Sequence, residues 1–214
     1  RVLPSTLAQV RLWAERMDGV TVCGELNIGS GSGACRRVWL DPSPLAHSAT
    51  IDAILDADLV LLGPGSLFTS VLPHLAIPEI AHAMRDTRAL RAYIGNVMTQ
   101  GGETEGFDAA EHIHRVQDAI PGCLDVAIVH DGPIDADAVS RYALQRQEPV
   151  AIDDRRLAAT GVRIIRRDLA ANGPVVRHDG AAIRAVIREL TRDFPSRLRP
   201  DRGARHLQQT PPST

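Results

Sequence analysis

The chain has 214 residues, of which 44% are hydrophobic, enough for one large domain with a substantial core. Its formal net charge of −2 gives no overall attraction to nucleic acid or to an anionic membrane. No apolar run approaches the roughly 20 residues that a membrane-spanning helix needs. All 24 basic residues are arginine, a bias that we attribute to genomic base composition. The chain starts at Arg1 without an initiator Met or a signal peptide, so we expect further sequence upstream.

The cysteines indicate the redox compartment. Cys23, Cys35 and Cys123 are widely spaced and form no zinc-type pair. A reducing environment is the simplest interpretation, and we therefore expect a cytoplasmic protein.

The first part of the chain predicts a small antiparallel β unit. Apolar residues alternate from Ala8 to Ala14, and the turn signal Asp18-Gly19 follows, which is typical of a β-hairpin. Residues 29–33 read as a flexible Gly/Ser loop, and residues 37–40 as a third strand. Residues 5–41 are thus expected to form a β insertion within a domain of residues 1–194.

After residue 50, strands and helices alternate. Continuous apolar runs predict strands at 59–62, 92–94, 126–129 and 162–165, the first of them buried on both faces. Apolar stripes at helical spacing predict helices near 51–55, from Pro78, over 105–119, and after a capping Asp179. The order indicates an α/β fold: a Rossmann-like parallel sheet with helices on both faces.

The last residues differ from the rest in composition. Residues 195–214 are rich in Arg, Pro, Gln and Thr and have no apolar stripe, so we predict a disordered tail. Residues 181–214 hold seven arginines against three acidic residues, which suits either a solvated end or contact with an anionic partner.

A first candidate site directly follows the run that ends at Leu62. The segment 63–70 reads GPGSLFTS. Open α/β sheets bind ligands at strand ends, and glycines let the backbone approach a phosphate closely. The pattern predicts a phosphate site or, alternatively, an ordinary strand-to-helix turn. Its candidate ligand-binding residues are Gly63, Gly65, Ser66 and Thr69.

A second candidate site follows the strand at 92–94. The segment 96–107 reads NVMTQGGETEGF. Uncharged amides and hydroxyls in such a loop suit sugar hydroxyls or the edge of a nucleobase. The alternative is a polar surface loop with a helix cap at Thr104. The candidate residues are Asn96, Thr99, Gln100, Glu103 and Thr104.

These two segments, in this order and with Glu111-His112 after the second, resemble the YvcK-like (gluconeogenesis factor) family within the CofD-like superfamily. The similarity covers roughly residues 2–190. It implies a Rossmann-like fold that binds a UDP-sugar such as UDP-N-acetylglucosamine. It also implies a role in central carbon metabolism, cell-wall synthesis and cell shape, with cell-wall synthesis proteins as partners.

The resemblance also extends to two later positions. Tyr142 and Arg177 match an Arg-Tyr pair and an Arg-His-Asp run of the family, and we expect Tyr142 to stack on the uracil and Arg177 to pair with the diphosphate. The alternatives are a packing aromatic and a surface charge. The chain departs from the family at Phe68 and Phe107, where Tyr is common, and it lacks the family's N-terminal glycine-rich turn.

Three functions remain open on this basis. The first is a binding or regulatory protein without catalytic residues, and the second is a metal-dependent phospho-group transferase related to 2-phospho-L-lactate transferase. The third is a scaffold that uses the basic tail. We favour the first, because no activated nucleophile or acid–base pair stands out. We predict no cofactor, no nucleic-acid partner and no metal site, since His112 and His114 at i and i+2 do not face each other on a helix. A homo-oligomer stays open.

Overall fold

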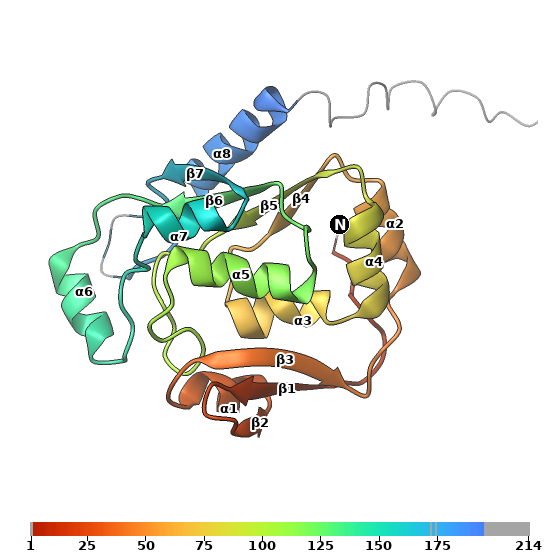
Figure 1. Cartoon of the computed structure of the whole chain (residues 1–214), viewed down its shortest axis with the longest axis horizontal. Coiled ribbons are helices and arrows are strands. Elements are labelled where there is room, and N and C mark those ends of the chain that lie inside the picture. The colour runs from red at the N-terminus through yellow and green to blue at the C-terminus, as the bar shows by residue number, and fades with distance from the viewer. Residues whose placement is uncertain (1, 172, 174, 195–214) are drawn as a thin grey trace, which may run out of the picture.

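A four-stranded parallel sheet forms the centre of the computed structural model, which describes residues 2–171, 173 and 175–194. Its strands are β4 (Leu59–Leu62), β5 (Leu90–Ile94), β6 (Val126–His130) and β7 (Arg163–Arg167), in that spatial order. Every neighbouring pair is parallel. The predicted α/β fold with a parallel sheet is therefore confirmed (Figure 1). The predicted disordered tail, residues 195–214, lies outside the described residues.

Helices alternate with these strands. They are α2 (Ser48–Leu55), the π-helical turn η1 (Leu67–Val71), α3 (Leu72–Leu75), α4 (Pro78–Asp86), α5 (Ala109–Ala119), α6 (Ala136–Ala143), α7 (Asp154–Ala159) and α8 (Gly180–Asp193). Four of them begin at an aspartate whose side chain accepts a hydrogen bond from a backbone N–H of the first turn, which stabilises the helix start. These caps are Asp108, Asp135, Asp153 and Asp179. In the described residues, every helix is too short or too polar to cross a lipid bilayer.

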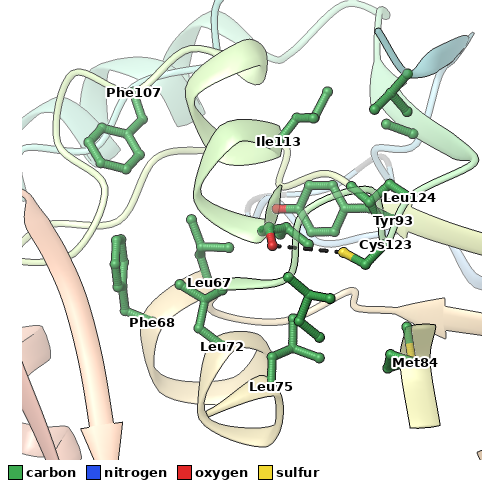
Figure 2. Close-up of a cluster of buried hydrophobic side chains, with 14 of the residues drawn as sticks. Leu67, Phe68, Leu72, Leu75, Met84, Tyr93, Phe107, Ile113, Cys123 and Leu124 are labelled. Carbon is green, nitrogen blue, oxygen red and sulfur yellow. Dashed lines mark hydrogen bonds between the residues drawn. The ribbon is translucent and has the colours of Figure 1, made fainter. Parts of the chain in front are cut away.

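Successive side chains of the sheet point to two separate cores. On β6, Ala127 and Val129 pack on the face that α4, α5 and α7 cover, whereas Val126 and Ile128 face α8. Figure 2 shows the larger core, in which the ring of Tyr93 lies between α5 and the leucines of η1 and α3. Helices thus cover both faces of the sheet, as predicted (Figure 1).

The antiparallel unit packs beside η1 and α3, away from the parallel strands (Figure 1). It consists of β1 (Arg11–Arg16), β2 (Thr21–Cys23) and β3 (Cys35–Asp41) in the order β2-β1-β3. This confirms the predicted small antiparallel sheet. The Gly/Ser loop was predicted too long, because its first two residues belong to a short helix, α1 (Glu25–Ser30), which Ile28 anchors by full burial.

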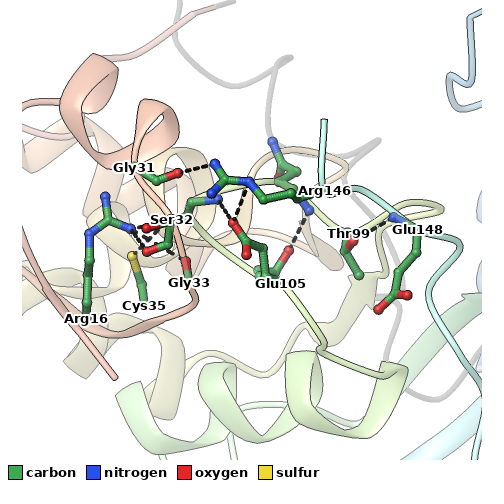
Figure 3. A network of polar contacts seen from close by, with 12 residues as sticks. Arg16, Gly31, Ser32, Gly33, Cys35, Thr99, Glu105, Arg146 and Glu148 are labelled. Carbon is green, nitrogen blue, oxygen red and sulfur yellow. Dashed lines mark hydrogen bonds and ion pairs between the residues drawn. The ribbon is translucent and has the colours of Figure 1, made fainter. Parts of the chain in front are cut away.

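A buried arginine joins this unit to the rest of the chain. Arg16 is 5% exposed, and its guanidinium donates to five backbone carbonyls. The shortest of these bonds, 2.9 Å, reaches Gly102 O in the second candidate loop. Figure 3 shows Arg16 on one side of this loop and Arg146 on the other, where Arg146 pairs with Glu105. The loop is therefore held from two sides.

Two further predicted features, besides the Gly/Ser loop, need correction. The strand β4 was expected to be buried on both faces, but all four of its residues are half-buried, because it is an edge strand of the described sheet. The helix expected over 105–119 starts at Ala109, since Asp108 caps it. The helices α6 and α7 were not predicted, because neither carries a long apolar stripe; α6 buries Ala138 and α7 buries Leu157.

Candidate functional site

Both candidate loops lie at the carboxyl edge of the parallel sheet. The first loop (63–70) leaves β4 and the second (96–107) leaves the adjacent β5. The turn after β4 requires glycine: Gly63 has a φ of 86°, and a Cβ there would lie 2.9 Å from Ile94 O. The backbone of the first loop therefore sits directly against the end of β5.

Side chains of the second loop bond to the first. The amide of Asn96 donates to Gly65 O at 3.1 Å, and the amide of Gln100 donates to Ser66 Oγ at 2.7 Å. The hydroxyl of Tyr93 donates to Asn96 Oδ1 at 3.2 Å and fixes the orientation of that amide. These four loop residues are half-buried and line one continuous edge of polar groups. The sequence pattern predicted all four, and the structure brings them together.

Three other predicted residues lie deeper. Thr99, Glu103 and Thr104 are 0%, 4% and 1% exposed. Glu103 accepts from Phe68 N at 3.3 Å and from the Thr69 hydroxyl at 3.1 Å, which joins the two loops a second time. Burial raises the pKa of Glu103, while the bonds from Thr69 and Phe68 oppose that rise.

The two threonines stabilise the second loop from within. Thr104 Oγ1 accepts from Gln100 N at 2.9 Å. Thr99 exchanges two bonds with Glu148: its N–H donates to Glu148 O at 2.7 Å, and its hydroxyl accepts from Glu148 N at 2.9 Å (Figure 3). With Glu103, they form a buried support beneath the half-buried edge.

Tyr142 and Arg177 come from a third region that reaches the same edge. Tyr142, on α6, accepts a bond from Val176 N at 3.2 Å, one residue before the exposed Arg177. The next residue, His178, donates from Nε2 to Gly95 O at 3.0 Å, at the end of β5. The two bonds link Tyr142 to the residue before Arg177, and the residue after Arg177 to Gly95, which precedes Asn96 in the chain.

Histidines at this edge were not among the predicted site residues. A small cavity there is lined by Tyr93, Gly95, Asn96, Ala109, His112, Val129, His130 and Val150. His112 and His130 are 1% and 9% exposed. Burial lowers the pKa of both imidazoles. The bond to the Asp108 carbonyl and the Asp108 carboxylate oppose the shift at His112, and the Asp168 carboxylate opposes it at His130. The position of His130 at the end of a buried apolar strand was the signal that could have singled it out.

Among the described residues, no three His, Cys, Asp or Glu side chains cluster closely enough to hold a metal ion. Arg177 is exposed and lies between Val176, which donates to the Tyr142 hydroxyl, and His178, which bonds to Gly95 O at the end of β5. Such an arrangement can bind a polar, anionic ligand through neutral donors and one guanidinium.

A family model described as 2-phospho-L-lactate transferase CofD matches residues 1–170. The chain belongs to the CofD family. The gluconeogenesis factor of Halalkalibacterium halodurans is 37% identical over 194 residues, which cover 88% of this chain and 60% of the relative. The gluconeogenesis factor of Bacillus subtilis is 36% identical over 199 residues, which cover 90% of this chain and 62% of the relative.

A solved structure of a relative has the same fold as this chain. The crystal structure of a member of the UPF0052 family from Bacillus halodurans superposes with a TM-score of 0.82 at 36% identity, covering 86% of this CofD-family chain and 61% of the other. The family resemblance read from the two loops is therefore confirmed. The chain spans about 60% of the length of these relatives.

Proposed function

We propose that this CofD-family chain binds a nucleotide sugar, such as UDP-N-acetylglucosamine, at the carboxyl edge of its parallel sheet. The observation that carries the proposal is the pair of bonds between the two loops, Asn96 to Gly65 and Gln100 to Ser66. They hold neutral amides and a hydroxyl beside a glycine backbone at the place where open α/β sheets bind nucleotides.

The remaining predicted residues complete this proposed site. Arg177 would pair with the diphosphate, and Tyr142 would stack on the uracil. Gly63, Thr69, Thr99, Glu103 and Thr104 would act by holding the loops in place. The bond between Tyr142 and Val176 N supports a common role for Tyr142 and Arg177, because it ties the ring to the segment that carries the guanidinium.

The biological role that we propose is regulatory. The protein would sense the nucleotide sugar in the cytoplasm and pass that state to cell-wall synthesis proteins, linking central carbon metabolism to cell-wall synthesis and cell shape. The gluconeogenesis factors among its relatives support the metabolic part of this role. The three free cysteines of the described chain are consistent with a reducing compartment.

Calorimetric titration of UDP-N-acetylglucosamine into the full-length protein tests the proposal. Arg177→Ala and Tyr142→Ala should each weaken binding about fivefold or more, on typical magnitudes for charge-assisted bonds and aromatic contacts. Two variants serve as controls. Arg155→Ala removes another exposed arginine, on α7, and Tyr142→Phe keeps the ring but not the hydroxyl. Absence of saturable binding to the wild-type protein would reject the proposed function.

Phospho-group transfer is the second candidate, because the matching family model is described as a 2-phospho-L-lactate transferase. Such a transfer would use a metal ion to neutralise phosphate charge. It predicts product formation that requires Mg²⁺, whereas the binding function predicts saturable binding without turnover. Incubation of the protein with nucleotide sugar and Mg²⁺, followed by phosphorus NMR, separates the two.

A further inference from the structure

Two buried histidines approach the small cavity at the carboxyl edge from different elements. His112 comes from α5 and His130 from the end of β6. In each imidazole Nε2 is buried and has no hydrogen-bond partner among the described residues. Because an unpartnered buried nitrogen costs free energy, two histidines with such a nitrogen in the lining of one cavity point to a polar group that binds there.

The other ring nitrogen of each histidine decides its tautomer. His112 Nδ1 lies 2.8 Å from Asp108 O, a carbonyl that can only accept, so Nδ1 carries the proton and Nε2 is an acceptor. His130 Nδ1 lies 3.6 Å from Asp168 Oδ1 and accepts from Leu169 N at 3.0 Å. With the Leu169 N–H directed at Nδ1, the neutral ring carries its proton on Nε2, which is then a donor. The two Nε2 atoms therefore offer one acceptor and one donor.

The size of the cavity limits what can bind there. Its volume is about 10 Å³, roughly the room that one oxygen atom with its hydrogens needs. A hydroxyl group donates one hydrogen bond and accepts another, which matches the pair of histidines. A carboxylate, a phosphate oxygen or an ammonium group can satisfy one of the two nitrogens but not both.

We propose that His112 and His130 form a subsite for one hydroxyl group of the bound ligand, a sugar or ribose hydroxyl. This inference rests on the proposed function, because the cavity shares Tyr93 and Asn96 with the polar edge where the nucleotide sugar would lie. The hydroxyl donates to His112 Nε2 and accepts from His130 Nε2–H. Water offers the same chemistry, and the experiment must separate the two sources.

Asparagine substitutions test the subsite with little other change. The side chain of Asn reproduces Nδ1 of histidine but not Nε2. His112→Asn can still donate to Asp108 O, and His130→Asn can still accept from Leu169 N. Each variant therefore removes the nitrogen assigned to the cavity and keeps the bond that holds the side chain. His114→Asn is the matched control, because His114 lies on α5 but does not line the cavity.

Two measurements on the full-length protein follow. By calorimetry, His112→Asn and His130→Asn should each weaken binding of UDP-N-acetylglucosamine about fivefold, while His114→Asn binds like wild type. By nitrogen NMR at neutral pH, the wild-type protein should show His112 protonated at Nδ1 and His130 at Nε2. The NMR measurement needs no variant, so it still tests the inference if a substituted protein fails to fold.

The outcomes separate this inference from the proposed function. Wild-type affinity in both cavity variants would mean that the cavity holds water alone and would overturn the subsite, while leaving the proposed function intact. The reverse tautomer at either histidine would also overturn it. If the wild-type protein binds no uridine nucleotide, the proposed function fails and the ligand subsite fails with it.

Discussion

Two parts of the chain reach the same edge of the sheet but are held differently. One is the pair of loops after β4 and β5, and the other is the segment of residues 175–178, which carries Arg177. The loops share a buried carboxylate, Glu103, and are joined by four side-chain contacts between them. Residues 175–178 are tied to α6 and to β5 by one hydrogen bond each, from Val176 N to the Tyr142 hydroxyl and from His178 Nε2 to Gly95 O. A backbone bond from Ala171 N to Arg177 O adds a third tie, and Val175 is 46% exposed. The two loops are thus joined around a buried carboxylate, whereas residues 175–178 are more exposed, and exposed segments with few buried contacts are typical of elements that adjust on binding.

The largest loss of stability is expected from a substitution in the two loops. Glu103→Ala removes the acceptor of Phe68 N and of the Thr69 hydroxyl and leaves a small cavity, so we expect a loss of about 3 kcal/mol in the free energy of unfolding. Chemical denaturation measures this loss. Glu105→Ala, in the same loop but half-buried, should cost much less, and equal losses would contradict the special role of Glu103.

Gly63→Ala tests the contact between the first loop and β5. An alanine at a φ of 86° is strained, and its Cβ would lie 2.9 Å from Ile94 O. We expect a loss of about 2 kcal/mol in thermal or chemical unfolding. Gly122→Ala is the control, because Gly122 also has a positive φ, 69°, but has nothing within 4 Å of an added Cβ. A similar cost at both positions would show that strain alone, without the contact, explains the loss.

Weakening the contact between α6 and residues 175–178 should cost less stability. Tyr142→Phe removes the acceptor of Val176 N, and we expect a loss of about 1 kcal/mol in global stability at most. Hydrogen exchange should show faster exchange of the Val176 amide, with the amides of the second loop unchanged. Equal acceleration in the second loop would show that this loop and residues 175–178 open together, and the two parts of the edge would then not differ in stability.

His112, on α5, lines the same cavity as Asn96 of the second loop and should make stability depend on pH. Burial lowers the pKa of His112 below its ordinary value of 6.5, against the opposing effects of Asp108 and Glu111. The unfolded chain therefore binds a proton more readily than the folded one, so this contribution to stability is present above pH 6.5 and declines as the pH falls below it. The difference in unfolding free energy between wild type and His112→Asn should shift with pH in this direction, and a constant difference would contradict it.

The sequence predicted the parts of the fold that local patterns determine. Four apolar runs became β4 to β7, and Asp179 caps α8 as expected. The short helices α1, α6 and α7 have too few apolar positions to produce a helical stripe. The burial of β4 depends on what lies beside it in the sheet, which no local pattern contains.

For the candidate site too, the sequence predicted what local patterns determine and missed what depends on distant contacts. Residue types and strand ends were enough to predict that Ser66, Asn96 and Gln100 belong to neighbouring loops at one edge of the sheet. They were not enough to tell these half-buried groups from the buried Thr99 and Glu103, because burial here depends on partners distant in sequence. Glu148 and Phe68, which contact those two residues, lie 49 and 35 positions away.

The guanidinium of Arg16 has a consequence for the composition of the chain. Its two terminal nitrogens reach carbonyls in α1, in the turn before β3 and in the second loop. A lysine ammonium has three donors on one atom and cannot span these separate acceptors. All 24 basic residues are arginine, which base composition explains at most exposed positions. At position 16 the codon bias and the structural requirement coincide, and this arginine should persist in relatives whose genomes favour lysine.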